Sequence, residues 1–413
     1  MPASRWVSSS TESAATRRRY HPGRDFRRAL NIEELRRVAR RRVPGFAWEY
    51  VEGGAEDELA LARNRQAFDG WRFVPRTLVD TTGRHLRTSV FGREQSLPLV
   101  IAPTGLNGVL RRGGDVMLAR AAAAAGIPFC LSTVANARAD EIVRGAGGRV
   151  WMQLYALNAP GLVEDVVARA EAAGCEALVF TTDANVFGSR EWDRRSFRAP
   201  GKLAPRMLLD VLGHPRWMLD VMVPHGLPPF VNVMDFLPPE ARTAKSGVSR
   251  IPALFAPSIS WDDVARLRER WPRKLVIKGI LDPADVERAV RIGCDGVVLT
   301  NHGGRQLDSA PAPIEMLPEI ARAHGARITI FVDGGFRRGS DILKAIALGA
   351  HAVMLGRATL YGLAAGGEAG ASHALGILGS EADRVLGQLG CRSLADLTPA
   401  MLREGAPTMP GTG

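Results

Sequence analysis

Residues 301–308, Asn-His-Gly-Gly-Arg-Gln-Leu-Asp, combine the residue types that acid–base chemistry on a small anion requires. His302 can take up and return a proton near neutral pH, and Arg305 adds a permanent positive charge three residues later. Gly303 and Gly304 allow the backbone to pass close to a ligand. A single histidine is more often a structural residue than a catalytic one, so the prediction of a base depends on what surrounds His302.

Two further residues could support that base. Asp183 could orient the imidazole of His302 and stabilise its charged form, as carboxylates do for catalytic histidines. Lys278 has two interpretations. It could form a buried ion pair, or it could stabilise an electron-accepting ring in its reduced form.

Two glycine-containing stretches, 333–339 and 355–357, predict a phosphate site. Glycine amides can approach an anion closely, and guanidinium groups can donate two hydrogen bonds to phosphate oxygens. A pair of ordinary turns with surface arginines is the alternative. The residues concerned are Asp333, Gly334, Gly335, Arg337, Gly356 and Arg357.

Short apolar runs, each about as long as a buried strand, recur along the chain. They are residues 99–102, 127–131, 150–154, 177–181, 274–278, 296–300, 328–332 and 352–355. Helical patterns lie between most of them, and several end in glycine at residues 126, 174, 293 and 349. Eight such units predict an α/β fold with a closed (β/α)8 barrel; a doubly wound open sheet is the alternative.

In such a barrel, chemistry takes place at the C-terminal ends of the strands. All eight runs end in polar residues or glycine, and a barrel brings these ends to one mouth. The residues are Pro103, Thr104, Gly105, Ser132, Gln153, Tyr155, Thr181, Asp183, Lys278, Thr300, His302, Asp333, Gly334, Gly335, Gly356 and Arg357.

The spacing of the runs also predicts how the chain is divided. Residues 1–28 are polar and arginine-rich, which is typical of a disordered tail. A helical extension begins after Asn31, a plausible N-cap, and the barrel domain is expected over residues 29–400. The long gap between the fourth and fifth runs predicts an insertion at 198–258, and residues 401–413 form a C-terminal tail.

Charge and cysteine usage limit the classes of function. The net charge is +11, but residues 1–42 hold twelve arginines and four acids, so the surplus lies mostly in the N-terminal segment. A solvated tail, or one attracted to an anionic surface, is expected there, and a nucleic-acid partner is not. Four scattered cysteines and no apolar leader predict reduced thiols, no metal and a cytoplasmic protein.

Together these residues closely resemble the FMN-dependent 2-hydroxy acid dehydrogenase and oxidase family, which includes glycolate oxidase, lactate oxidase and mandelate dehydrogenase. The resemblance covers about residues 31–400, and the 301–308 run is its most specific motif. Further stretches (52–57, 103–108, 214–217 and 357–365) are most similar to the mandelate-oxidising members.

The resemblance implies roles for individual residues. FMN would contact Pro103, Thr104, Gly105, Ser132, Gln153, Thr181, Lys278 and Thr300, and its phosphate Asp333, Gly334, Gly335, Arg337, Gly356 and Arg357. The substrate carboxylate would bind Tyr50, Arg190 and Arg305, and Tyr155 would contact the substrate hydroxyl. His302 would accept either the hydroxyl proton, in hydride transfer, or the α-proton, in a carbanion route. Taken alone, Tyr50 suits a packing aromatic residue and Arg190 a surface cation.

Two positions depart from the glycolate oxidase type, which carries Trp at the place of Val134 and Ala at that of Gly105. Val134, with Phe187 and Leu157, should enlarge the substrate pocket and favour an aromatic or branched acid such as mandelate. Gly105 favours a dehydrogenase that reacts poorly with oxygen. L-lactate dehydrogenase, an oxygen-using oxidase, a phosphate-binding barrel of the inosinate dehydrogenase or isopentenyl diphosphate isomerase type, and a non-enzymatic barrel are the alternatives.

The segment 202–236 mixes apolar residues with lysine and arginine, a pattern that suits an interfacial membrane segment. A loop and helix covering the barrel mouth is the alternative. The family resemblance implies peripheral attachment to the inner face of the cell membrane, electron transfer to a quinone, and a homo-oligomer.

Overall fold

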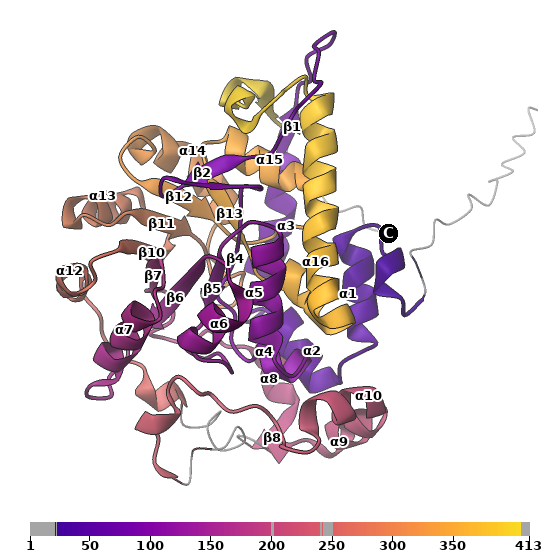
Figure 1. Ribbon diagram of the computed structural model, residues 1–413, viewed down its shortest axis with the longest axis vertical. Helices are drawn as coiled ribbons and strands as arrows, with labels where there is room; N and C mark the ends of the chain where they lie inside the picture. The colour runs from indigo at the N-terminus through magenta and orange to yellow at the C-terminus, as the bar shows by residue number, and fades with distance from the viewer. Residues whose placement is uncertain (1–20, 22, 200–201, 240–241, 243–250, 406–413) are drawn as a thin grey trace, which may run out of the picture.

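The computed structural model describes residues 21, 23–199, 202–239, 242 and 251–405. Eight parallel strands close into a barrel in the order of the chain, with the last strand, β13, beside the first, β4 (Figure 1). The closed barrel is confirmed and the open sheet is excluded. The strands are β4 (Leu99–Ile101), β5 (Phe129–Leu131), β6 (Val150–Tyr155), β7 (Ala177–Thr181), β10 (Lys274–Ile280), β11 (Gly296–Leu299), β12 (Thr329–Val332) and β13 (Ala352–Leu355).

Helices surround the strands, as the repeated helical patterns predict. They are α5 (Gly114–Ala124), α6 (Ala139–Ala146), α7 (Leu162–Ala172), α12 (Trp261–Arg270), α13 (Pro283–Ile292), α14 (Pro313–His324), α15 (Gly339–Ala347) and α16 (Arg357–Gln388). All four glycines predicted to end helices, at 126, 174, 293 and 349, have positive φ angles. A residue with a side chain is strained in that conformation, so these glycines fix where each helix turns back to a strand.

Large side chains fill the barrel interior. Trp151 on β6 and Phe331 on β12 are fully buried, with ring centroids 5.5 Å apart. Phe91 packs on both rings from the turn between β2 (Thr88–Val90) and β3 (Arg93–Gln95), a hairpin that joins no barrel strand. This packed core leaves the C-terminal ends of the strands as the open end of the barrel.

The N-terminal extension is helical, as predicted, and consists of α1 (Ile32–Arg40), α2 (Gly45–Glu52) and α3 (Leu59–Gln66). Asn31 caps α1 by accepting a hydrogen bond from the amide of Glu34 at 2.9 Å. The folded chain extends past both predicted boundaries. A 3-10 turn at Phe26–Arg28 precedes residue 29, and β14 (Leu402–Glu404) pairs with β1 (Trp71–Phe73) after residue 400. Most of the predicted tails, residues 1–20, 22 and 406–413, lie outside the described residues.

The longest helix, α16, stands beside α1 at one side of the barrel (Figure 1). It is bent at Gly366 and Gly367, whose backbone angles are not helical. A side chain at Gly366 would collide with the ring of Phe26, which is buried. The bend therefore makes room for the start of the N-terminal extension.

The segment between β7 and β10 contains the insertion predicted at 198–258, and the described parts of this segment form short elements. These are α8 (Glu191–Arg195), β8 (Phe197–Ala199), β9 (Lys202–Leu203), α9 (Pro205–Leu212), α10 (Pro215–Trp217), a π-helical turn (Met218–Met222) and 3-10 turns at Met234–Phe236 and Ile251–Leu254. Trp217 is buried, and its indole donates to the carbonyl of Val109 on α4 (Asn107–Leu110) at 2.8 Å. No helix in the described part of the chain is long and apolar enough to cross a membrane.

Candidate active site

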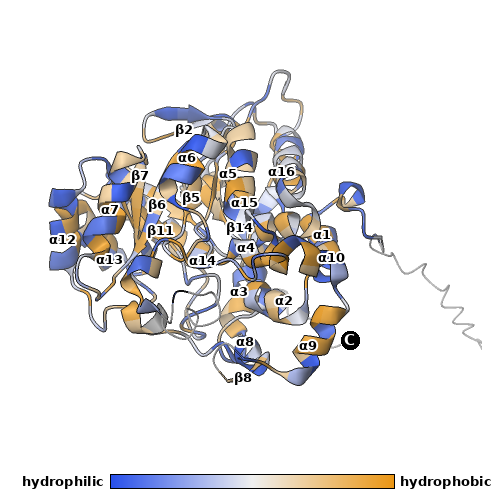
Figure 2. Ribbon diagram, turned by 60° about the horizontal axis from the view of Figure 1, so that its bottom comes forward, coloured by the Kyte–Doolittle hydropathy of each residue, from blue (hydrophilic) through white to orange (hydrophobic). Residues whose placement is uncertain are grey.

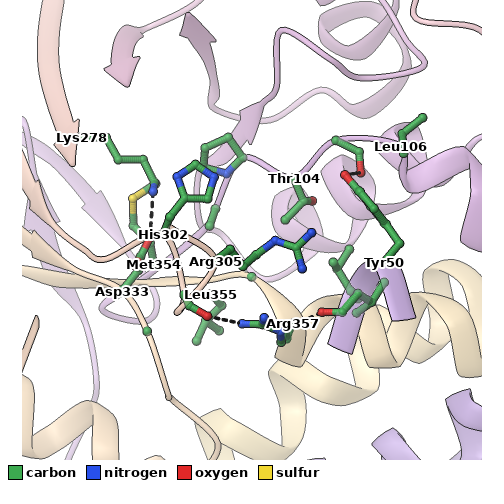
Figure 3. Close-up of a pocket in the computed structure, with 18 of the residues that line it drawn as sticks. Tyr50, Thr104, Leu106, Lys278, His302, Arg305, Asp333, Met354, Leu355 and Arg357 are labelled. Carbon is green, nitrogen blue, oxygen red and sulfur yellow. Dashed lines mark hydrogen bonds and ion pairs between the residues drawn. The ribbon is translucent and has the colours of Figure 1, made fainter. Parts of the chain in front are cut away.

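A hollow of about 1430 Å³, counting the space open to solvent, lies at the C-terminal ends of the strands (Figure 3). It is large enough for a nucleotide-sized cofactor and a small substrate together. Most of the site residues predicted from the sequence line it: Tyr50, Pro103, Thr104, Gly105, Val134, Tyr155, Arg190, Lys278, His302, Arg305, Asp333, Gly334, Gly335, Arg337, Gly356 and Arg357.

Five of the residues predicted to hold the cofactor or to take part in catalysis do not line the hollow but lie behind its wall. Ser132, Gln153 and Thr181 form a buried chain, in which the Ser132 hydroxyl donates to Gln153 Oε1 at 3.3 Å and the Gln153 amide donates to Thr181 Oγ1 at 3.0 Å. These bonds fix three neighbouring strand ends. Thr300 and Asp183 stand behind Lys278 and His302, and their contacts are described next.

His302 has the geometry of a supported base. Its Nδ1 lies 2.9 Å from Oδ1 of Asp183, which leaves Nε2 as the ring nitrogen for a substrate. Burial lowers the pKa of His302 below its usual value, because the contribution of Asp183 offsets only part of the desolvation. Burial also acts on Asp183, but His302 and Lys278 outweigh it and hold the pKa of that carboxyl down. The pair is therefore a neutral imidazole beside a carboxylate.

The backbone of His302 is strained to reach this position. Its φ angle is +58°, in the left-handed region that residues with a β-carbon seldom adopt. The amide of His302 donates to Thr300 Oγ1 at 2.9 Å, and Thr300 in turn donates to Asp333. Strain that the surroundings enforce in this way is typical of functional positions.

Lys278 and Asp333 form a buried ion pair, with Nζ 3.2 Å from Oδ2 (Figure 3). Burial opposes the charge of Lys278, yet Asp333 and Asp183 raise its pKa above the usual value, so it stays protonated. Lys278 therefore forms the buried ion pair that was one of its two predicted roles. Because Lys278 also lines the hollow, its charge remains next to any ligand there.

Two guanidinium groups and a phenol line one part of the hollow, and we name them the carboxylate clamp after the role predicted from the sequence. The clamp consists of Tyr50, Arg190 and Arg305. The Arg305 guanidinium lies 5.3 Å from the ring centroid of Tyr50, and Nε of Arg190 donates to the Arg305 carbonyl at 3.4 Å. Burial and, next, the charge of Arg190 lower the pKa of Arg305 to about 9. An anion bound between the two arginines would relieve that repulsion.

Apolar side chains line the part of the hollow near Tyr155. Phe187 forms an edge-to-face pair with Phe255 at 4.7 Å, and the ring of Phe255 lies 4.8 Å from that of Tyr155. Phe187 lines the hollow, as predicted from the sequence. Leu157 does not line it. Its backbone instead pairs with Phe255, which anchors the end of the insertion to the wall.

Gly105 and Val134 pack tightly against each other. A β-carbon added at Gly105 would lie 2.5 Å from Cγ2 of Val134 and 3.3 Å from the hydroxyl of Tyr50. That hydroxyl donates to the Gly105 carbonyl at 3.2 Å. The small residue at 105 and the medium one at 134 are therefore matched in size.

The residues of the predicted phosphate site fit a bound nucleotide. Gly334 and Gly335 have φ angles of +99° and +81°, and a side chain at Gly335 would collide with the backbone of Asn64. Arg337 lines the same end of the hollow, where its Nη2 lies 3.4 Å from the hydroxyl of Tyr361. Bare backbone beside a guanidinium suits a phosphate.

Arg357 has a different set of contacts. Its guanidinium donates to the carbonyls of Val51 at 2.7 Å, Gly53 at 2.9 Å and Gly303 at 2.7 Å. These bonds tie the end of α2 to the turn that follows His302. A role for Arg357 in holding phosphate stays a prediction.

A buried polar network behind the Thr104 loop was missed from the sequence. Asn107 accepts from Thr104 Oγ1 at 2.9 Å and donates to Asp115 at 2.7 Å, and Asp115 accepts from the amide of Asn136 at 2.8 Å. Burial raises the pKa of Asp115 to about 6. Asn136 then donates to the carbonyl of Pro229 in the insertion at 2.8 Å. The residues are polar and close in sequence to the Thr104 loop, but no motif marks them.

Fold and site together define the class of (β/α)8 enzymes that oxidise a small organic acid on a bound flavin. Comparison with known proteins agrees. The model of the FMN-dependent dehydrogenase family matches residues 39–404. The (S)-mandelate dehydrogenase of Pseudomonas putida is 43% identical over 376 residues, which are 91% of this chain and 94% of that protein. The L-lactate dehydrogenase of Caulobacter vibrioides is 41% identical over 91% of this chain and 97% of that protein.

Solved structures give the same result. The crystal structure of the monotopic membrane protein (S)-mandelate dehydrogenase superposes with a TM-score of 0.87 at 43% identity, over 92% of this chain and all of that one. A mandelate oxidase complex superposes with a TM-score of 0.76 at 35% identity, over 91% of this chain and all of that one. The chain belongs to the FMN-dependent dehydrogenase family. It is an FMN-dependent oxidoreductase of the 2-hydroxy acid dehydrogenase type.

Proposed function

We propose that the protein oxidises an (S)-2-hydroxy acid with an aromatic or branched side chain, such as mandelate, to the 2-keto acid. The observation that carries this proposal is the partly buried His302–Asp183 pair, with 2.9 Å between Nδ1 and Oδ1, beside the carboxylate clamp. FMN, when bound, accepts the two electrons that leave the substrate. Pro103, Thr104, Gly105, Ser132, Gln153, Thr181, Lys278 and Thr300 are proposed to hold its ring and ribityl chain, and Asp333, Gly334, Gly335, Arg337, Gly356 and Arg357 its phosphate.

The chain's own residues divide the remaining work. The substrate carboxylate binds the clamp of Tyr50, Arg190 and Arg305, which fixes the 2-carbon next to His302. Burial raises the pKa of Tyr155 to about 12, so its hydroxyl stays protonated and can donate to the substrate oxygen. His302 takes the proton at Nε2, and Asp183 stabilises the imidazolium that results.

The aromatic preference rests on the shape of the pocket. Val134, Phe187, Phe230 and Phe255 line the hollow with apolar surface next to Tyr155. An aryl ring can pack on these side chains, whereas the methyl group of lactate would contact few of them. Because lactate dehydrogenases and mandelate dehydrogenases are about equally similar to this chain, the pocket is the stronger argument.

The electron acceptor is proposed to be a quinone, with the protein attached to the inner face of the cell membrane. Leu208, Leu209 and Leu212 on α9 are 54%, 71% and 65% exposed, and Leu219 adds a fourth exposed leucine in the adjoining turn. Figure 2 shows apolar residues along α9 at the edge of the molecule. The similar (S)-mandelate dehydrogenase is described as a monotopic membrane protein, which supports the same arrangement here.

An anaerobic reduction experiment tests the proposed reaction. Purified protein should be yellow and should be bleached by (S)-mandelate without oxygen, with a higher kcat/KM for mandelate than for L-lactate or glycolate. His302→Ala should bind FMN with an unchanged spectrum and lose at least 100-fold in bleaching rate. Bleaching of this variant at near the wild-type rate would refute the role of His302, and a preference for glycolate would refute the aromatic substrate.

A further inference from the structure

Asp193 is an acidic residue on α8 that faces the carboxylate clamp. Its Oδ2 lies 3.6 Å from Nη2 of Arg305, beyond ordinary hydrogen-bond range. Its Oδ1 is buried and has no hydrogen-bond partner among the residues that the structure describes. A carboxylate in such a place usually accepts several hydrogen bonds, so this one is held there without the contacts that would stabilise it.

Arg305 does not depend on Asp193 for its position. Nη1 of Arg305 donates to the carbonyl of Gly53 at 2.7 Å, and its guanidinium packs over the ring of Tyr50. Arg190, three residues before Asp193, donates to the backbone carbonyl of Arg305. What Asp193 adds to the clamp is therefore negative charge and not orientation.

The negative charge of Asp193 offsets the repulsion between the two positive charges of the clamp. The guanidinium groups of Arg190 and Arg305 repel each other, and burial together with Arg190 lowers the pKa of Arg305. Asp193 acts in the opposite direction on Arg305. Burial raises the pKa of Asp193 itself, while Arg305 and Arg190 limit that rise. The Asp193 carboxylate thus balances the positive charges of both Arg305 and Arg190. A second carboxylate, that of a ligand, would compete with Asp193 for the attraction of these two charges.

We propose that Asp193 is the internal counter-ion of the carboxylate clamp and that the substrate carboxylate takes over this role when it binds. Asp193 is then a specificity-determining residue that weakens the binding of every carboxylate ligand through charge alone. This inference rests on the proposed function of the clamp. Neutral ligands of the same shape are insensitive to Asp193.

Substitution of Asp193 by its neutral isostere tests the inference. The full-length FMN-loaded protein is titrated with phenylacetate, which lacks the 2-hydroxyl group and is not oxidised, and binding is followed by the flavin absorption spectrum. Asp193→Asn should bind phenylacetate about three- to tenfold more tightly than wild type, the effect of removing one partly screened charge. Phenylacetamide, which is neutral, should bind both proteins equally.

Glu191→Gln is the matched control. Glu191 lies on the same helix, is exposed, and pairs only loosely with Arg195 at 3.7 Å. The substitution removes the same charge two residues away, and phenylacetate affinity should stay within twofold of wild type. Asp193→Ser provides a second neutral variant if the asparagine variant folds poorly.

A melting experiment adds a readout that does not depend on turnover. Without ligand, Asp193→Asn should melt at a lower temperature than wild type, because the guanidinium groups lack a counter-ion. Saturating phenylacetate should reduce this difference. Unchanged or weaker phenylacetate binding in both neutral variants would overturn the inference. If wild type bound no phenylacetate and was not reduced by mandelate, the proposed function itself would fail.

Discussion

At the scale of single residues, the pairing of His302 with Asp183 sets the pH range in which His302 can act as the proposed base. Only the neutral imidazole can accept a proton, and burial lowers its pKa. Protonation therefore removes activity only at a pH below that of an ordinary histidine, which titrates at about 6.5. Asp183 has two effects, since it raises the pKa of His302 and stabilises the product imidazolium.

Asp183→Asn separates these effects. The variant should lose about 100-fold or more in kcat, because the imidazolium is no longer stabilised. The acid limb of its kcat/KM profile should move to lower pH, because the group that raised the pKa of His302 is gone. Both are measured from steady-state rates between about pH 4.5 and 8.5. Asp235→Asn, in an exposed pair with Arg138, is the control. An unmoved acid limb would show that Asp183 does not set the pKa of the base.

At the scale of elements, repeated local signals made the barrel predictable. Each strand is an apolar run, and each of four helices ends beside a glycine with positive φ, so neighbouring residues alone specify the unit. The insertion carries no such repeat. Phe230 and Phe255 lie 49 and 74 residues after the end of β7 at Thr181, and both line the hollow. The backbone of Phe255 pairs there with that of Leu157. No sequence pattern near these two phenylalanines predicts that they line the hollow.

The helices after β4 link the insertion to the Thr104 loop. Asp115 accepts from Asn107 and from the amide of Asn136, so Asp115→Ala would leave one buried and one partly buried donor without this acceptor. We expect a loss of about 2–4 kcal/mol in the free energy of unfolding, measured with denaturant. Asp140→Ala removes an exposed carboxylate that pairs with Arg144 and should cost less than about 1 kcal/mol. Equal losses in the two variants would contradict the structural role of Asp115.

At the scale of the whole molecule, the sequence predicted the site residues at the strand ends but not the residues that support them from other elements. Strand ends must meet in a barrel, so sequence position alone brought Lys278, His302 and Asp333 together. Asp193 and Asp115 could not be found in this way, because their importance depends on which cation or amide the fold sets beside them. Tyr50 and Arg190 needed the family motif, since neither lies at a strand end.

The exposed leucines of α9 predict how the molecule meets a membrane. Substituting Leu208, Leu209 and Leu212 by glutamine keeps the helix but removes most of its exposed apolar area. The bound fraction in a vesicle sedimentation assay with anionic lipid should fall at least tenfold, and mandelate oxidation with a soluble acceptor should not change. A control with glutamine at Leu30, Leu59 and Leu78, which are also exposed, should bind like wild type. Equal loss in both variants would contradict attachment through α9.

The bonds from Arg357 to the carbonyls of Val51 and Gly53 have a consequence for the order of assembly. Tyr50 and Gly53 leave the ribosome some 250 residues before Arg305 and 300 before Arg357, yet the bonds from both arginines hold the end of α2 over the barrel. Contacts so distant in sequence form late, because the intervening chain must first be ordered. During synthesis, the end of α2 therefore lacks its bonds to both arginines until the last strand has joined the barrel and α16 has begun. The nascent protein gains its acid-binding pocket only in the final stage of translation.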